Sequence, residues 1–117
     1  MQALQLTTRI VDDFPDLAIT NYARIRRALL LHQTGQTREA ILELEGLESS
    51  LRGSAEVHTA LAAVLYADDH SKLLRAETQF DLGADFDRRY ANLKWVDREK
   101  HWPPRMLEAL QHFLKLD

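Results

Sequence analysis

The sequence predicts an all-α domain built from short antiparallel helix pairs and closed by a C-terminal helix. Apolar residues recur at three- and four-residue steps along most of the chain, which is the spacing of one helix face. Short turns containing glycine or aspartate separate these stretches, and no segment alternates polar and apolar residues as a half-buried strand would. The 117 residues, 45% of them hydrophobic, suffice for one modest core.

Composition excludes several classes of function. The sequence has no cysteine, which rules out disulfides, thiolate nucleophiles and cysteine–zinc sites. No apolar run approaches the roughly 20 residues that cross a bilayer, so we expect no membrane insertion. Residues 1–38 carry five basic and three acidic side chains, residues 39–87 carry three and eleven, and residues 88–117 carry seven and four. This acidic centre between mildly basic ends argues against nucleic acid as a partner.

The first full helix pair is predicted within residues 15–52. One apolar face runs from Tyr22 to His32, and Gly35 is expected to end this helix because glycine readily adopts the left-handed cap conformation. Thr37 is the expected N-cap of the second helix. The residues that this second helix should bury are Ala40, Ile41, Leu44, Leu47 and Leu51.

A second pair is predicted within residues 53–86. Ser54 and Ser71 are the expected N-caps of its two helices, and the polar residues 68–70 form the turn between them. The apolar residues expected to face the core are Val57, Leu61, Ala62, Leu65 and Tyr66 in the first helix, and Leu73, Leu74, Ala76 and Phe80 in the second.

An internal period becomes visible when the two pairs are superposed. The positions that recur after 34 or 36 residues are Ala28 and Ala62, Leu31 and Leu65, Ala40 and Ala76, and Leu44 and Phe80. Alanine at these places lets two crossing helices approach closely. A helix–turn–helix unit of this length, with a glycine in its turn, resembles the tetratricopeptide repeat. The resemblance implies an α-solenoid with repeats at 15–52 and 53–86, although the tryptophan and final proline usual in each repeat are replaced.

The two ends of the chain fit the same frame. Residues 1–14 have the spacing of a repeat's second helix, and Pro15 stands where a repeat ends. Either this helix caps the solenoid alone or the sequence is part of a longer protein. We favour the second alternative, because terminal repeats usually carry a polar outer face. Residues 87–117 are the expected C-terminal cap.

The cap carries the stretch KHWPPRM followed by a helical pattern. It resembles the endings of a group of cyanobacterial and chloroplast tetratricopeptide proteins. The residues that carry the resemblance are Arg89-Tyr90, Leu93, Trp95, His101 to Pro104, Met106, Ala109-Leu110 and Phe113-Leu114. This resemblance implies a role in photosynthetic complex assembly, with photosynthetic membrane proteins or their assembly factors as partners, and a cytoplasmic or thylakoid-associated location.

The physical chemistry of this stretch predicts a lid on the core. Pro103 and Pro104 fit the first turn of a helix, where a missing N–H costs nothing. Trp102 can fold back toward Leu107, and we expect it to be largely buried. The apolar face of the following helix, from Met106 to Leu114, is expected to close the open end of the solenoid. The alternative is an exposed tryptophan that binds a partner.

Residues with catalytic or metal-binding spacing are lacking. The histidines His32, His58, His70, His101 and His112 show no metal-ligand spacing, so we expect no metal. The sequence also lacks a phosphate-binding glycine loop and an identifiable nucleophile with its base. We therefore expect no enzyme activity and no cofactor.

A binding surface remains as the candidate site. In a helical solenoid the first helices of successive repeats line a concave groove. The residues expected to meet a protein or peptide partner there are Tyr22, Arg26, Leu29, His32, Gln33, Glu56, Thr59 and Tyr66. The apolar members fit a core equally well. The sequence thus favours a protein–protein interaction module or scaffold, and the alternative is a structural or regulatory segment of a longer protein whose groove is occupied intramolecularly.

Overall fold

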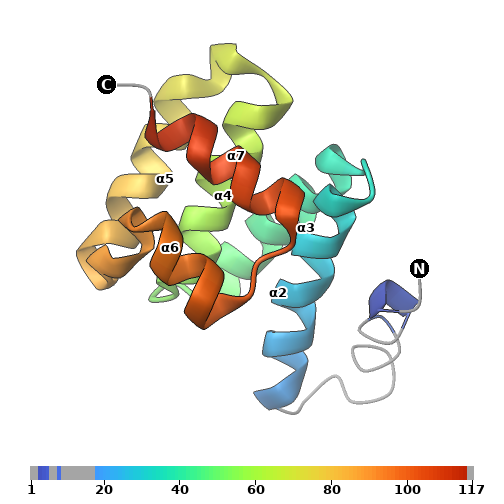
Figure 1. The fold of residues 1–117 in the computed structure, drawn as a ribbon. Helices are drawn as coiled ribbons and strands as arrows, with labels where there is room; N and C mark the ends of the chain where they lie inside the picture. The colour runs from blue at the N-terminus through green and yellow to red at the C-terminus, as the bar shows by residue number, and fades with distance from the viewer. Residues whose placement is uncertain (1–2, 6–7, 9–17, 116–117) are drawn as a thin grey trace.

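The computed structural model describes residues 3–5, 8 and 18–115, and within these ranges every regular element is a helix (Figure 1). The long helices are α2 (Ala18–Gln33), α3 (Thr37–Ser50), α4 (Ala55–Asp68), α5 (Leu73–Phe86) and α7 (Pro104–Leu114). The all-α class is therefore confirmed for the described residues. The helix expected at 1–14 and the proline after it lie largely outside them.

Short helical turns connect these helices. A 3₁₀ turn, η1 (His70–Lys72), joins α4 to α5, and a second, η2 (Arg88–Ala91), follows α5. The chain then forms the single turn α6 (Leu93–Trp95), which continues directly into the π-helical turn η3 (Val96–Lys100). Together these turns carry the chain from the end of α5 to the start of α7.

Consecutive helices pack on one another, with α2 against α3 and α4 against both α3 and α5. The C-terminal helix α7 crosses in front of α4 and also reaches α2 (Figure 1). This position differs from the prediction, which placed α7 over the open end of the helix stack. The small residues Ala60 and Ala63 of α4 are completely buried, and their size lets another helix approach α4 along its length.

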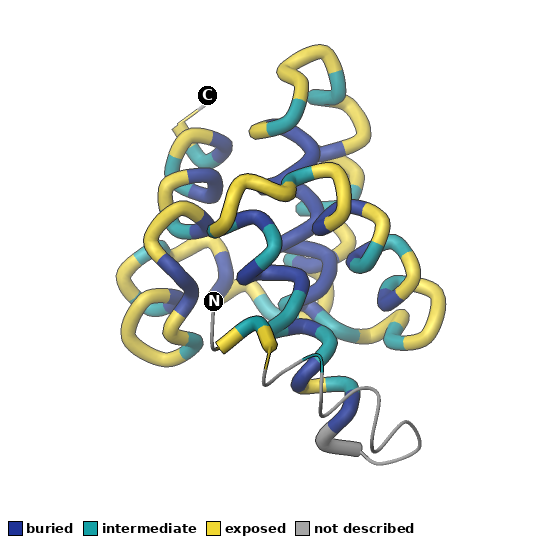
Figure 2. Tube along the Cα trace, turned by 90° about the vertical axis from the view of Figure 1, so that its right-hand side faces the viewer, coloured by how far each residue is buried: buried dark blue, intermediate teal, exposed yellow. Residues whose placement is uncertain are grey.

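The helix α4 is buried on all sides. Ala55 and every residue from Val57 to Tyr66 are buried, and the buried segments gather in the middle of the molecule (Figure 2). The sequence predicted only one apolar face for this helix. A helix that is apolar all round must be covered all round. The neighbours α3, α5 and α7 supply that cover.

Several predicted turn and cap residues are confirmed. Gly35 ends α2 with a φ of 88°, a conformation that favours glycine. The side chain of Ser54 caps α4 by accepting a hydrogen bond from the Val57 N–H at 3.2 Å. Pro103 and Pro104 stand at the start of α7. These turns and caps could be predicted from the sequence because each depends on interactions between residues only a few positions apart.

Two predicted caps are wrong. Gln36, not Thr37, holds the N-cap position of α3, and the Thr37 hydroxyl instead lies 2.9 Å from Nδ1 of His32. Asp69, not Ser71, caps the turn before α5, with its carboxylate accepting a hydrogen bond from the Ser71 N–H at 2.9 Å. Gln36 forms no side-chain capping hydrogen bond, whereas Asp69 takes the capping role that was expected of Ser71.

Small residues set the distance between the helices. The alanines expected at helix crossings, Ala28, Ala40, Ala62 and Ala76, are all completely buried. The sequence analysis missed Gly83 of α5. A Cβ atom added there would lie 2.9 Å from Oγ1 of Thr59 and 3.2 Å from the carbonyl oxygen of Ala55. The absence of a side chain at Gly83 therefore lets α5 touch α4.

Substituting the two helical glycines should have opposite effects. Gly83→Ala should lower the free energy of unfolding by ~1–3 kcal/mol, because the new methyl group meets the backbone of α4. Gly46→Ala in α3 should raise it by ~0.5–1 kcal/mol, because the nearest atom to its Cβ is an Arg24 nitrogen at 3.8 Å. Urea denaturation measures both, and a Gly83→Ala variant as stable as the parent would contradict the close approach.

Candidate functional site

The predicted partner groove is covered by the C-terminal segment, residues 100–114. On the α2 side, Arg26 donates hydrogen bonds to the carbonyl oxygens of Lys100 and His101, at 3.3 and 3.1 Å. The side-chain oxygen of Gln33 accepts a hydrogen bond from the Arg105 N–H at 2.8 Å. Arg26 and Gln33 therefore bind backbone groups of the C-terminal segment, as they were expected to bind a peptide.

The α4 side of the groove holds the same segment through side chains. The indole N–H of Trp102 donates to the carboxylate of Glu56 at 3.0 Å. The ring of Tyr66 meets the ring of Phe113 edge-on, with centroids 6.2 Å apart, and stacks on His70 at 4.1 Å. Two further residues expected in the groove thus contact the C-terminal segment.

Of the remaining four predicted site residues, three are buried and one is exposed. Leu29 and Thr59 are completely buried, and Thr59 lies against Gly83 of α5. His32 is buried beside Thr37. Tyr22 is 63% exposed. That any of the eight residues contacts a partner stays a prediction.

An aromatic cluster of Tyr90, Trp95 and Trp102 anchors the start of the C-terminal segment. The Tyr90 ring lies 5.1 Å from the Trp95 ring and 6.4 Å from the Trp102 ring, measured between centroids. Trp102 is only 3% exposed, which confirms the predicted burial. Burial, assisted by the Glu56 and Asp87 carboxylates, raises the pKa of Tyr90 above its ordinary value. The phenol therefore stays neutral across the physiological range.

Arg89 closes the outer edge of this cluster. Its guanidinium lies 4.6 Å from the centre of the Trp95 ring and forms an ion pair with Asp87 at 2.8 Å. The hydrogen bonds from Arg89 lower the pKa of Asp87 to about 2. The Asp87 carboxylate also accepts from the Arg89 N–H, so it caps η2 at the same time.

His101 turns the chain from η3 toward α7 in a left-handed conformation, with a φ of 53°. This conformation is uncommon for a residue with a side chain. It places the His101 carbonyl oxygen within reach of Arg26 and directs the next residue, Trp102, inward. This turn could not be predicted from the sequence, because glycine or asparagine, and not histidine, usually marks such a position.

Removing the Trp102 side chain should destabilise the protein strongly. Trp102→Ala should lower the free energy of unfolding by ~3–5 kcal/mol, the range for a buried large aromatic side chain. Trp102→Phe is the matched control, since it keeps much of the ring packing and removes the hydrogen bond to Glu56; we expect a loss of ~1–2 kcal/mol. Thermal melts followed by circular dichroism measure both. An unchanged melting temperature for Trp102→Ala would contradict the lid.

A small polar pocket of about 170 Å³ lies where α2, the start of α3, α4 and α7 meet. Its lining includes His32, Thr37, Arg105, Glu108 and His112. Burial lowers the pKa of His32 below its ordinary value, and the nearby Arg105 guanidinium lowers it further. Across the described ranges, no three histidine, aspartate or glutamate side chains are grouped so that they could hold a metal ion.

The depressed pKa of His32 predicts a pH dependence of stability. The unfolded chain takes up a proton at His32 near the ordinary pKa of 6.5, whereas the folded chain does so only at lower pH. The stabilisation is therefore complete above that value and is lost as the pH falls through the folded pKa. Between about pH 7.5 and about pH 5, the parent should lose more unfolding free energy than His32→Gln. Urea denaturation at both pH values tests this, and parallel losses would contradict it.

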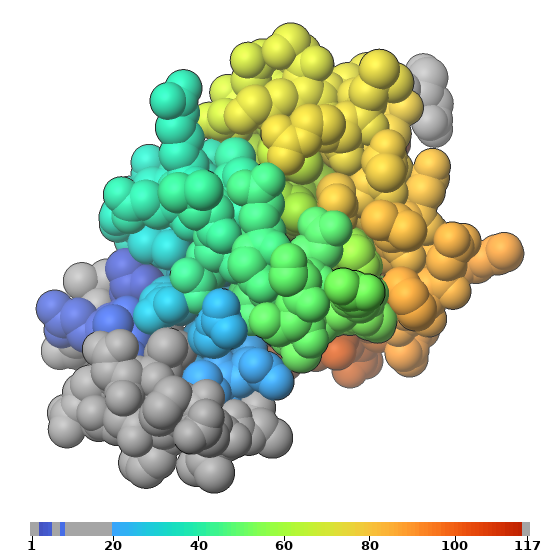
Figure 3. Space-filling model, turned by 180° about the vertical axis from the view of Figure 1, so that it is seen from behind, coloured from blue at the N-terminus to red at the C-terminus, as the bar shows by residue number. Residues whose placement is uncertain are grey.

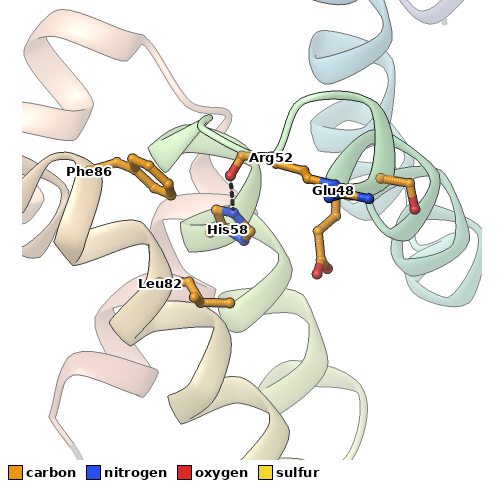
Figure 4. Close-up of a pocket in the computed structure, with 6 residues that line it drawn as sticks. Glu48, Arg52, His58, Leu82 and Phe86 are labelled. Atoms are coloured by element: carbon orange, nitrogen blue, oxygen red, sulfur yellow. Dashed lines mark hydrogen bonds between the residues drawn. The ribbon is translucent and has the colours of Figure 1, made fainter.

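The C-terminal helix α7 does not cover the opposite side of the molecule. Figure 3 views the molecule from behind and shows α3 and α5 on this outer face, where Arg75 of α5 forms an ion pair with Glu45 of α3. A pocket of about 420 Å³ lies between them, lined by Glu48, Ser49, Arg52, His58, Leu82 and Phe86 (Figure 4). Leu74 of α5 was expected to face the core but is 79% exposed, so that prediction is wrong.

Comparisons of the chain with protein families, curated proteins and solved structures found no match. Within the described residues, no helix is both long and apolar enough to cross a membrane. The tetratricopeptide resemblance therefore rests on the residue pattern of the two helix pairs and of the cap.

Proposed function

We propose that the protein is a non-catalytic protein-interaction module of the tetratricopeptide type, whose concave face is filled by its own C-terminal segment. The observation that carries this proposal is the set of contacts made by Arg26, Gln33, Glu56 and Tyr66. These residues were expected to hold a partner peptide, and they hold the chain's own segment instead. Arg26 and Gln33 do so through backbone groups of that segment, as they would with an extended peptide.

The tight packing of the C-terminal segment indicates that it covers the concave face permanently and is not displaced by a partner. Met106 and Leu110 are completely buried, and Trp102 and Phe113 are nearly so. Burying each such side chain is worth ~1.5–3 kcal/mol. A peptide that displaced the segment would have to replace all of this burial. We therefore propose that partners meet the module outside the concave face.

The proposed class of partner is suggested by the resemblance of residues 87–117 to the endings of cyanobacterial and chloroplast tetratricopeptide proteins. This resemblance supports a scaffold for photosynthetic membrane proteins or their assembly factors. A second candidate is a groove that opens for its partner, and the exposed ring of Tyr22, one of the residues expected to line the groove, favours it. The two candidates differ in how independently α7 can detach from α4.

Native-state hydrogen exchange should separate the two candidates. If α7 is a permanent part of the core, amides of α7 and α4 should exchange with the same free energy of opening, because both open only on global unfolding. The measurement follows amide exchange by NMR in increasing, sub-denaturing urea. Trp102→Ala provides the control, since it should lower both values equally when the two helices form one unit.

An opening of α7 at a free energy lower than that of α4 by ~2 kcal/mol or more would overturn the closed-face proposal. That result would support the groove that opens. Loss of partner recovery with the single substitution Tyr22→Ala would point the same way, because this exposed side chain contributes little to the core.

A further inference from the structure

The outer surface of α5 carries two parallel rows of side chains. The first row contains the exposed apolar residues Leu74, Leu82 and Phe86, which are 79%, 39% and 56% exposed. The second row contains the exposed carboxylates Glu77, Asp81 and Asp85. Because a helix turns by about 100° per residue, the acidic row runs beside the apolar row, about 100° around the helix, since Asp81 and Asp85 directly precede Leu82 and Phe86.

The acidic row is electrostatically unpaired. Within the described part of the chain, none of its three carboxylates forms an ion pair or a hydrogen bond. Arg75, the basic residue at the other end of this surface, is already paired with Glu45 of α3 at 2.9 Å. Residues 39–87 as a whole carry eleven acidic and three basic side chains. The surface therefore presents negative charge directly beside exposed apolar area.

The apolar row ends at the pocket of about 420 Å³ described above, which we call the outer pocket. The side chains that line this pocket are held in place by contacts within the protein. Phe86 lies parallel to the ring of His58, with the centroids 6.1 Å apart (Figure 4). Nε2 of His58 donates to the carbonyl oxygen of Arg52 at 2.9 Å, and Nδ1 lies 2.8 Å from the side-chain oxygen of Gln79. These contacts fix His58 and leave Phe86 exposed, so the pocket exists before any partner arrives.

We propose that the outer face, formed by α5 and the adjoining end of α3, docks a basic amphipathic helix of a partner protein. The partner's apolar side chains cover Leu74, Leu82 and Phe86, and one of them enters the outer pocket. Its Lys or Arg side chains, spaced three to four residues apart, meet Glu77, Asp81 and Asp85. This is the helix-in-groove mode of recognition, with charge complementarity selecting the basic partner.

The length of α5 sets the length of its partner. Its 14 residues span roughly 20 Å, which matches a partner helix of three to four turns. This inference rests on the proposed function only in taking the protein as an interaction module. It does not depend on permanent closure of the concave face, since the outer face lies on the other side of α4.

The test uses three synthetic peptides and the isotopically labelled full chain. The probe is an amphipathic Leu/Lys helix of about 14 residues. One control has the same apolar pattern with Glu in place of Lys, and the other has the composition of the probe in a scrambled, non-amphipathic order. We expect NMR shift changes with the Leu/Lys helix alone, confined to α5, the end of α3 and the residues that line the outer pocket.

Matched charge reversals separate a local site from general attraction. The double substitution Glu77→Lys and Asp81→Lys should weaken binding of the Leu/Lys helix at least about tenfold. The pair Glu39→Lys and Asp97→Lys changes the net charge equally at exposed positions elsewhere, and binding should stay within about twofold. Leu82→Ser with Phe86→Ser should abolish the shifts. Circular dichroism confirms that each variant is folded.

Three outcomes of the binding measurements would overturn the proposal. They are equal weakening by both charge reversals, equal binding of the scrambled peptide, and no binding of the Leu/Lys helix. Shifts mapped to α2 and α7 would also overturn it and would point to an opened concave face. Hydrogen exchange of α7 decides the closed-face proposal separately, so a failure of either inference is recognised by itself.

Discussion

The complete burial of α4 is the constraint on which the rest of the structure depends. A helix with apolar side chains on every side cannot lie on a surface, so it needs neighbours around its whole circumference. The helices α3 and α5 come directly before and after it in the chain and cover two sides. The third side is covered by α7, which arrives from the far end of the sequence. The side of α4 that was expected to line a groove is therefore part of the core.

Small side chains allow the close packing around α4, but this packing buries a polar group without a hydrogen bond, which costs free energy. Gly83 brings α5 against Thr59, and the Thr59 hydroxyl is buried with no hydrogen-bond partner among the described residues. An unsatisfied buried hydroxyl costs ~1–3 kcal/mol. The buried His58 avoids much of this cost because its Nε2 donates a hydrogen bond to the carbonyl oxygen of Arg52. The core thus tolerates one unpaired polar group where the helices approach most closely.

The sequence predicted what is local and missed what depends on distant contacts. Helix positions, the turn at Gly35, the cap at Ser54 and the prolines before α7 all followed from spacing and turn chemistry. The position of α7 could not be derived, because an amphipathic helix shows only that it must cover something. Ala60 and Ala63 of α4 were the one available sign that α7 covers this side. A groove that holds a peptide needs polar side chains, whereas alanines suit the close packing of another helix.

The candidate site shows the same division. Trp102 was correctly expected to be buried, because its cost of exposure can be judged from the residue alone. Its partner Glu56 lies 46 residues earlier and had been assigned to the groove. The exposed rows on α5 were also readable at four-residue spacing, but Leu74 had been counted with the core. Distinguishing an outer apolar row from an inner one requires knowing which side of α5 meets α4.

The long reach of the C-terminal segment has a consequence for biosynthesis. Arg26 binds carbonyl groups 74 and 75 residues further along the chain, and α4 is synthesised well before the helix that covers its third side. During translation, a nascent chain that has formed α2 to α5 still presents the apolar side of α4 that α7 later covers. Such exposed apolar surface is prone to aggregation until α7 covers it. Folding to the native state therefore waits until α7 has left the ribosomal exit tunnel.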